Sequence, residues 1–387
     1  MQQKSEIAKK PDILREITER KTRFLTLQDG TTFQGFSFGA EEPTEGETVF
    51  STSMVGYPEA LTDPSYRGQI LCLTYPLVGN YGVPSYEVAP HELPAFFESD
   101  CIQVRGLVVH EICKSPSHWQ SIRSLDEWLR TEKIPGIYGV DTRRLARVLR
   151  EKGVMLGRIG ADDVDRESNK KIDDPNKLDL VGQVSVHEPV TYCEGRPNRI
   201  ALIDCGVKNS IIRNLLKRNL TVVRMPHDAK ASEILNIEPA GVVVSNGPGN
   251  PKTCTSTINT IQELIGCDMP TLGICLGTQL IALAEGADTY KMKYGHRSQN
   301  QPVIDVDTGR CYITTQNHGY AVDKAQLENA GLEVWFVNAN DRSIEGIRHP
   351  KKPFWGVQWH PEASPGPTDT EFIFDFFVNK VIHDASS

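Results

Sequence analysis

The chain has 387 residues and a formal net charge of −8 at pH 7, with 39% hydrophobic and 24% charged residues. This length corresponds to two or three domains, and the composition is that of a globular protein rather than of a disordered one. The acidic balance gives no support to nucleic-acid binding, and no apolar run approaches the roughly 20 residues of a membrane span.

The first 22 residues are polar and carry four acidic side chains, which argues against both a secretory signal and a mitochondrial presequence. We expect residues 1–22 to form a polar extension. The nine cysteines are odd in number and include no C-x-x-C pair, so neither a zinc site nor a disulfide framework is indicated. These features favour a reducing compartment, and we predict a cytoplasmic location.

Strand patterns dominate the first half of the chain. Residues 23–39 predict a β-hairpin with Asp29 and Gly30 at its turn. Further strands are predicted at 47–53, 69–76 and 103–112. Helices are predicted at 121–133 and 141–153. We therefore expect residues 23–160 to form a smaller domain of mixed α/β type.

The character of the sequence changes after residue 160. Residues 161–179 are densely charged and nearly free of aromatic side chains, and we expect 161–196 to be a linker. Strands are then predicted at 198–206, 221–226, 240–249 and 271–277, alternating with helices at 209–219 and 278–287. This alternation predicts an α/β fold for residues 197–387, with a mostly parallel central sheet flanked by helices. Sites in such sheets lie at the carboxyl ends of the strands.

The sequence Gly273-Ile274-Cys275-Leu276-Gly277 joins a predicted strand to a predicted helix. A nucleophile on such a sharp turn needs very small residues two positions before and after it, and the N-terminus of the following helix favours a thiolate. Cys275 is therefore a candidate nucleophile, with the Leu276 N–H free to bind an oxyanion. The alternative is a buried structural thiol, which is common for cysteine.

A thiol nucleophile requires a base, and the segment QWHPEAS offers one. His360 follows a predicted strand, and Glu362 lies two residues further on, so both side chains point the same way on an extended backbone. Glu362 can then orient the His360 ring, which completes a Cys-His-Glu set. The alternative is a His-Pro-Glu turn on the surface.

Two other segments are candidates for binding. In VVVSNGPGNP (242–251), Gly247 can offer a second oxyanion donor. The segment TTQNHGYAVD (314–323) can bind a polar substrate through Asn317, His318, Gly319 and Tyr320. Each has a simpler interpretation, which is a strand-ending turn for the first and a hairpin turn for the second.

The segments SNGPGNP, GICLGTQL, QNHGYAV and QWHPEASPGP occur in this order, and together they resemble the class I (triad) glutamine amidotransferases. The resemblance covers residues 197–382. It implies hydrolysis of L-glutamine to glutamate and ammonia through a γ-glutamyl thioester, and this half-reaction requires no metal or organic cofactor.

The first half of the chain indicates which branch of the class I amidotransferases the chain resembles. Residues 48–84 and 134–153 resemble the amino domain of the small subunit of carbamoyl phosphate synthetase, and KMKYGHRSQNQPV (291–303) is typical of the same family. The residues of these segments are most similar to those of eukaryotic enzymes of pyrimidine synthesis. The resemblance implies a partner, either a synthetase large subunit or a fused synthetase domain, which receives the ammonia and uses ATP, Mg²⁺ and bicarbonate.

The resemblance assigns roles position by position. Cys275 is the nucleophile, His360 is its base and Glu362 orients His360. The N–H groups of Gly247 and Leu276 are the oxyanion donors. The glutamine-holding positions are Ser53, Gly249, Gln279, Asn317, Gly319 and Tyr320. Because Ser53 belongs to the amino half, the site is expected where the two halves meet.

Thr278 departs from the family, which has a histidine between Gly277 and Gln279. Since the base is His360, activity is expected to survive, and the change concerns packing beside the nucleophile. Two other functions remain open on the sequence: an inactive module that binds and regulates a synthetase, and a triad enzyme with another acceptor, as in guanylate or anthranilate synthesis. The intact triad argues against the first, and the amino half argues against the second.

Overall fold

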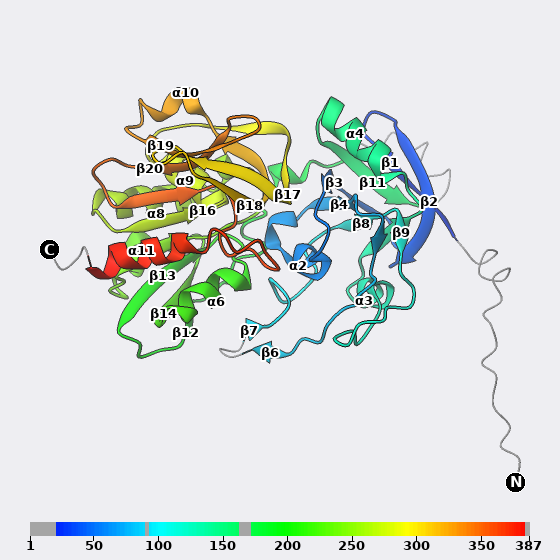
Figure 1. Ribbon diagram of the computed structural model, residues 1–387, viewed down its shortest axis with the longest axis horizontal. Helices are drawn as coiled ribbons and strands as arrows, with labels where there is room; N and C mark the ends of the chain where they lie inside the picture. Colours follow the sequence, from blue (N-terminus) through cyan, green and yellow to red (C-terminus); the bar gives the residue numbers. More distant parts are fainter. Residues whose placement is uncertain (1–20, 90–92, 162–171, 384–387) are drawn as a thin grey trace, which may run out of the picture.

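Two β-rich halves lie side by side along the long axis of the molecule (Figure 1). The computed structural model describes residues 21–89, 93–161 and 172–383. Most of the predicted extension at 1–22 and residues 162–171 of the predicted linker lie outside the described residues.

Seven strands of the first half close into a barrel in the order β1-β11-β3-β4-β8-β10-β2. They are β1 (Thr22–Leu27), β2 (Thr32–Gly39), β3 (Thr44–Ser51), β4 (Gln69–Leu73), β8 (Gly106–Val108), β10 (Pro135–Tyr138) and β11 (Met155–Gly160). Two short pairs accompany the barrel: β5 (Leu77–Val78) with β9 (Glu111–Ile112), and β6 (Val88–Ala89) with β7 (Leu93–Pro94). Closure leaves the barrel strands without a free edge.

The hairpin predicted at 23–39 is confirmed, because β1 and β2 pair antiparallel around a turn. Gly30 in that turn has a φ of +82°, a left-handed conformation that glycine adopts without steric cost. The single strand predicted at 103–112 is wrong in one respect. The chain changes partners there, since β8 pairs with β4 and β10 in the barrel, whereas β9 pairs with β5 outside it.

Side chains cap three of the four helical segments described in this half, whereas the first of them follows Gly56 and has no side-chain cap. They are α2 (Tyr57–Thr62), the 3₁₀ turn η1 (Pro64–Tyr66), α3 (Leu125–Thr131) and α4 (Thr142–Lys152). Ser124 and Glu127 form a capping box, so α3 starts later than predicted. The Asp141 carboxylate accepts a hydrogen bond from the Arg144 N–H at 2.9 Å, and α4 ends at Gly153.

The second half contains a ten-stranded sheet in the order β12-β14-β13-β15-β16-β21-β20-β19-β17-β18. The strands are β12 (Val190–Tyr192), β13 (Asn198–Asp204), β14 (Leu220–Pro226), β15 (Gly241–Val244), β16 (Thr271–Ile274), β17 (Thr289–Asp305), β18 (Cys311–Val322), β19 (Glu333–Asn338), β20 (Ile344–Arg348) and β21 (Phe354–Val357). The five neighbours from β14 to β21 are parallel, whereas the remaining pairings are antiparallel. The α/β fold is thus confirmed, with a parallel centre inside a mixed sheet.

Helices cover both faces of this sheet. They are α6 (Asn209–Lys217), α7 (Ala231–Leu235), α8 (Thr255–Gly266), α9 (Leu276–Ala284), α10 (Lys324–Leu327) and α11 (Phe372–His383), with 3₁₀ turns η2 (Pro175–Lys177) and η3 (Pro251–Thr253). The apolar side chains of α6 and α11 share one buried cluster, and those of α7, α8 and α9 share the other. Among the described helices, none is both long and apolar enough to cross a membrane.

Buried polar contacts join the two halves. The Glu98 carboxylate accepts hydrogen bonds from the N–H and the hydroxyl of Ser210, at 3.0 and 2.8 Å, at the start of α6. The Asn317 side-chain amide donates to Asp63 at 3.0 Å across the same boundary. Because buried polar groups are costly to leave unpaired, these bonds fix how the halves meet.

We predict that Glu98→Ala lowers the free energy of unfolding by about 2–4 kcal/mol, because it leaves two donors of Ser210 buried without an acceptor. Urea unfolding followed by circular dichroism measures this loss. Glu111→Ala, at an exposed position, is the control and should change stability by less than about 0.5 kcal/mol. Equal effects of the two substitutions would contradict the prediction.

Candidate active site

Cys275 sits on a strained turn between β16 and α9. Its backbone has φ +53° and ψ −104°, a conformation that residues other than glycine rarely adopt. A Cβ atom on Gly273 would lie 2.6 Å from the backbone of Gly277, and one on Gly277 would lie 2.1 Å from the carbonyl oxygen of Val244. Both glycines are therefore required for the turn, as the G-x-C-x-G pattern predicts.

The neighbouring strands hold this turn from both sides. The Cys275 N–H donates to the Val357 carbonyl of β21 at 2.8 Å, and the Gly277 N–H donates to the Ser245 carbonyl after β15 at 3.1 Å. The hydroxyl of Thr278 lies 2.7 Å from the same Val357 oxygen and 3.1 Å from the Gly273 oxygen. Thr278 is fully buried, so it ties the turn to β21.

The base and its orienting carboxylate follow β21 directly. His360 Nδ1 lies 2.7 Å from Glu362 Oε1, and both side chains are almost completely buried. Because the carboxylate accepts the Nδ1 proton, Nε2 is the ring nitrogen left for proton transfer. The structure thus brings together the pair that the sequence places two residues apart.

A third residue completes this charge cluster, and the sequence analysis missed it. Lys208 Nζ lies 3.0 Å from Glu362 Oε1, and its side chain is 5% exposed. Lys208 follows β13 at the same carboxyl edge of the sheet that carries Cys275. Its place just after a strand was the available signal, but a single lysine without a motif did not stand out.

The pKa values in the cluster follow from burial and charge. Burial alone would lower the pKa of His360, but Glu362 and the sulfur of Cys275 outweigh it and raise the pKa to about 10. Burial would raise the pKa of Glu362, yet Lys208 and His360 lower it to about 2. An imidazolium therefore forms readily beside Cys275, and Glu362 remains a carboxylate at neutral pH.

One cavity in front of Cys275 collects most of the predicted binding residues. Its lining includes Gly247, Gly249, Cys275, Leu276, Gln279, Asn317, Gly319 and Tyr320. Residues of the barrel half, among them Glu47 and Ser65, complete its wall. The cavity therefore lies between the two halves, where the resemblance places a glutamine site.

Ser53 is not among the residues that line this cavity, and Ser65 is. Ser53 lines a neighbouring cavity together with Lys208 and Asn317. The Ser65 hydroxyl accepts a hydrogen bond from the Asn246 side chain at 2.9 Å, just before Gly247. Ser65 lies in η1, in the segment Asp-Pro-Ser, and this capped turn was the signal in the sequence.

The two predicted oxyanion donors face the same cavity. Among the hydrogen bonds of the described residues, none uses the N–H of Gly247 or Leu276, so both remain available. Gly247 cannot be enlarged, because a Cβ atom there would lie 2.1 Å from the carbonyl oxygen of Cys205. A close pair of free N–H groups beside a thiol can stabilise a tetrahedral intermediate.

Residues 314–322 belong to strand β18, so the alternative interpretation of this segment as a hairpin turn is wrong. Its long pairing with β17 decides this conformation. Asn317 approaches the nucleophile, because its carbonyl oxygen lies 3.8 Å from Cys275 Sγ. The side chain of Gln279 donates to the Tyr320 carbonyl at 2.8 Å.

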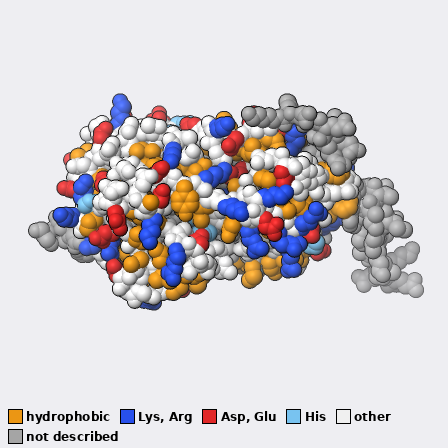
Figure 2. Space-filling view, turned by 90° about the horizontal axis from the view of Figure 1, so that it is seen from above, with side chains coloured by type: hydrophobic (Ala, Val, Ile, Leu, Met, Phe, Trp, Pro, Cys, Tyr) orange, Lys and Arg blue, Asp and Glu red, His pale blue; other side chains and the backbone are white. Residues whose placement is uncertain are grey.

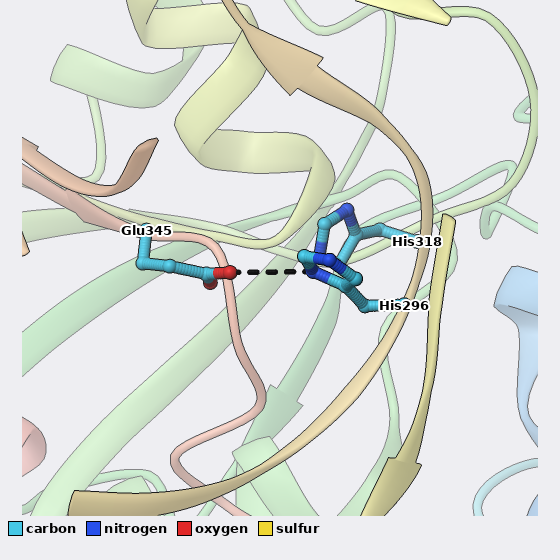
Figure 3. Close-up of side chains that lie close together, drawn as sticks. All are labelled: His296, His318 and Glu345. Atoms are coloured by element: carbon cyan, nitrogen blue, oxygen red, sulfur yellow. Dashed lines mark ion pairs between the residues drawn. The ribbon is translucent and has the colours of Figure 1, made fainter. Parts of the chain in front are cut away.

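His296 of β17, His318 of β18 and Glu345 of β20 lie close together (Figure 3), with potential metal-binding atoms within 4.8 Å of one another. Both ring nitrogens of His318 already have hydrogen-bond partners, at 2.9 Å in Tyr320 and 3.0 Å in Gln316. His296 Nε2 lies 2.9 Å from Asp341, and its Nδ1 lies 3.3 Å from Glu345. Although burial opposes the charge, these carboxylates raise the pKa of His296 to about 9. A protonated His296 therefore explains why two carboxylates approach its ring, and a metal ion would have to displace this proton.

A cysteine on a strand-to-helix elbow, with a buried His-Glu pair at the carboxyl edge of an α/β sheet, is the arrangement expected of a triad glutamine amidotransferase. Residues 201–380 match the family Glutamine amidotransferase class-I. Residues 25–159 match Carbamoyl-phosphate synthase small chain, CPSase domain.

Individual relatives extend this similarity over nearly the whole chain. The carbamoyl phosphate synthase small chain of Methanopyrus kandleri is 48% identical, over 92% of this chain and 97% of its own length. The arginine-specific small chain of Saccharomyces cerevisiae is 48% identical, over 92% of this chain and 87% of its own. The multifunctional protein CAD of Squalus acanthias is 49% identical over 92% of this chain, which corresponds to 16% of that protein. The chain therefore belongs to the carbamoyl phosphate synthase small chain family.

We predict that Thr278→Val lowers the free energy of unfolding by about 1–2 kcal/mol, because it removes the hydroxyl bonded to two buried carbonyl groups. The elbow should also lose its fixed distance to β21, which reduces kcat for glutamine hydrolysis roughly three- to tenfold. Thr260→Val is the matched control. Thr260 lies in α8, away from the elbow, and its buried hydroxyl also donates to a backbone carbonyl, that of Ala229, at 2.9 Å. That control should lose stability but keep kcat; equal kcat values for both variants would contradict the positioning role.

We predict that Lys208→Met moves the acid limb of the kcat/KM profile to higher pH. Lys208 and His360 together outweigh burial and lower the pKa of Glu362 from its ordinary value of 4.5 to about 2, so wild-type Glu362 is ionised throughout the working range. Without Lys208 the carboxyl group takes up a proton at higher pH and no longer orients His360. A pH series of steady-state rates measures the shift. Lys252→Met, whose lysine pairs with Asp288 outside the site, should leave the profile unchanged.

Proposed function

We propose that this chain is the glutaminase component of a carbamoyl phosphate synthetase. It hydrolyses L-glutamine to glutamate and ammonia, and the ammonia passes to a synthetase subunit or domain for carbamoyl phosphate formation. The observation that carries the proposal is the strained Cys275 elbow, which shares one cavity with two free N–H donors and whose side chain interacts with His360 of the His360–Glu362 pair. Membership of the small chain family supports the same conclusion.

In this proposal, glutamine enters the cavity between the two halves with its side-chain amide toward Cys275. The thiolate attacks the amide carbon, and the N–H groups of Gly247 and Leu276 bind the resulting oxyanion. Each such donor contributes about 3 kcal/mol to lowering the barrier in comparable enzymes. The His360 imidazolium then gives its Nε2 proton to the departing nitrogen, which leaves as ammonia, and a γ-glutamyl thioester remains on Cys275.

The second half-reaction regenerates the enzyme. Neutral His360 accepts a proton from water, and the resulting hydroxide attacks the thioester carbon. The carbon–sulfur bond breaks, glutamate leaves, and the thiolate and imidazolium are restored. Glu362 accepts the hydrogen bond from Nδ1 throughout both half-reactions, and Lys208 keeps Glu362 ionised.

The polar groups of the cavity wall suit the amino-acid end of the substrate. We assign the glutamine contacts to Gly249, Gln279, Asn317, Gly319 and Tyr320. On the barrel side we assign Ser53, which lines the adjoining cavity together with Asn317, and also Ser65, which lines the cavity in front of Cys275.

The proposal also includes the organisation of the chain. We assign residues 23–160 to the small-chain N-terminal domain and 197–387 to the amidotransferase domain, with a polar extension at 1–22 and a linker at 161–196. Within this linker, β12 (Val190–Tyr192) pairs with β14 at the edge of the amidotransferase sheet. Glutamine hydrolysis by these residues uses no metal or organic cofactor, and ATP, Mg²⁺ and bicarbonate are substrates and cofactors of the synthetase. The odd number of cysteines and the lack of a C-x-x-C pair support a cytoplasmic location.

We predict that Cys275→Ser abolishes glutamine hydrolysis, lowering kcat by at least about a thousandfold, while the circular dichroism spectrum stays unchanged. Ammonia and glutamate release, measured with the synthetase present, tests this outcome. Cys254→Ser makes the same atom exchange at another buried cysteine, outside the cavity, and should retain activity. Glutamine turnover by Cys275→Ser at the wild-type rate would overturn the assignment. A wild-type chain that binds the synthetase but releases no ammonia would instead indicate an inactive regulatory module.

A further inference from the structure

Helix α4 presents a row of arginines to solvent on the barrel half. Arg143, Arg147 and Arg150 follow one another at helical spacings of four and three residues, and all three are exposed. Side chains at these spacings lie on the same face of a helix, so their positive charges repel one another. Figure 2 shows basic side chains gathered over this part of the molecule.

No acidic side chain of the described residues forms an ion pair with any of these three arginines. Glu151 lies four residues after Arg147, but the two make no ion pair. The chain as a whole is acidic, with a net charge of −8, so the positive charge of this row is opposite to the net charge of the chain. An unneutralised row of guanidinium groups is typical of a surface that meets carboxylates elsewhere.

The three arginines border an open hollow. Its other walls are Thr52, Thr74, Tyr75 and Pro76, which come from the ends of two barrel strands, and Ala146 of α4. The Tyr75 side chain is 40% exposed. Just beyond Thr52 in the chain, Met54 and Val55 are 68% and 53% exposed. Exposed apolar and aromatic side chains beside arginines have the composition of a protein interface rather than of an ordinary surface.

We propose that this arginine face, defined as Arg143, Arg147 and Arg150 with the adjoining hollow, docks the synthetase that consumes the ammonia. The partner surface would place carboxylates against the three guanidinium groups and an apolar side chain in the hollow. The proposal rests on the proposed function, because it takes the synthetase as the partner.

The position of the arginine face favours the synthetase over other acidic partners. Ser53 and Val55 line the cavity that also contains Lys208 and Asn317, beside the catalytic cluster. Asn317 belongs to both this cavity and the one in front of Cys275. The same short loop, 52–55, therefore touches the hollow, the solvent and the cavity next to the site where ammonia forms. A partner seated on the arginine face covers this loop.

The test is a double charge reversal, Arg143→Glu with Arg147→Glu, measured for binding to the cognate synthetase large subunit. We expect the Kd to rise at least about tenfold and to depend less steeply on salt concentration than for the wild type. In the reconstituted enzyme, more than one glutamate should form for each carbamoyl phosphate, because ammonia escapes. Glutamine hydrolysis by the isolated chain should not change, since neither arginine lines the catalytic cavity.

The matched control is Arg105→Glu with Arg310→Glu, which makes the same change of net charge at two exposed arginines away from α4. The control should bind the synthetase like the wild type. Equal Kd values for the two double variants would overturn the proposal. So would a wild-type chain that binds anionic lipid vesicles through these arginines while the α4 variant keeps its affinity for the synthetase. Failure of the proposed function gives a different result, because the wild-type complex would then release no ammonia from glutamine.

Discussion

The rest of the site depends on one strained residue, Cys275. Its left-handed backbone costs about 1–3 kcal/mol, which the surrounding structure must supply. Hydrogen bonds from the strands on both sides supply it, and Gly273 and Gly277 leave room for the turn. Because β15 and β21 flank β16 and hold the elbow, the loop with Gly247 and the segment with His360 follow strands on either side of it. The geometry of the nucleophile and the geometry of its partners are therefore set by the same contacts.

A second constraint is the burial of charge. The Glu362 side chain is fully buried, and a lone carboxylate there would take up a proton. Lys208 and His360 both lie within 3.0 Å of its Oε1 atom and keep it ionised. The three groups therefore stabilise one another, and Glu362 can hold His360 in one orientation. The His296–Glu345 contact between β17 and β20 is stabilised in the same way, because a protonated histidine neutralises another buried carboxylate.

The barrel half contributes to the chemistry although it carries none of the triad. Asp63 binds Asn317, and Ser65 binds Asn246, so the two edges of the catalytic cavity are fixed by residues of η1 and the turn before it. The buried Glu98–Ser210 contact holds α6 against the same half. A small movement between the halves would change the cavity wall and both contacts together. This arrangement gives a partner bound to the barrel a physical means of influencing glutamine hydrolysis.

The sequence by itself determined the α/β class of the second half, the elbow at Cys275 and the His360–Glu362 pair, because strand periodicity, glycine spacing and a separation of two residues are local properties. Tertiary structure decided the rest. Lys208 joins Glu362 only after β13 and β21 lie in one sheet, and Ser65 rather than Ser53 faces the cavity because η1 packs against the loop before Gly247. The strand conformation of residues 314–322 likewise follows from pairing with β17, because contacts between distant segments produce no periodic pattern in the sequence.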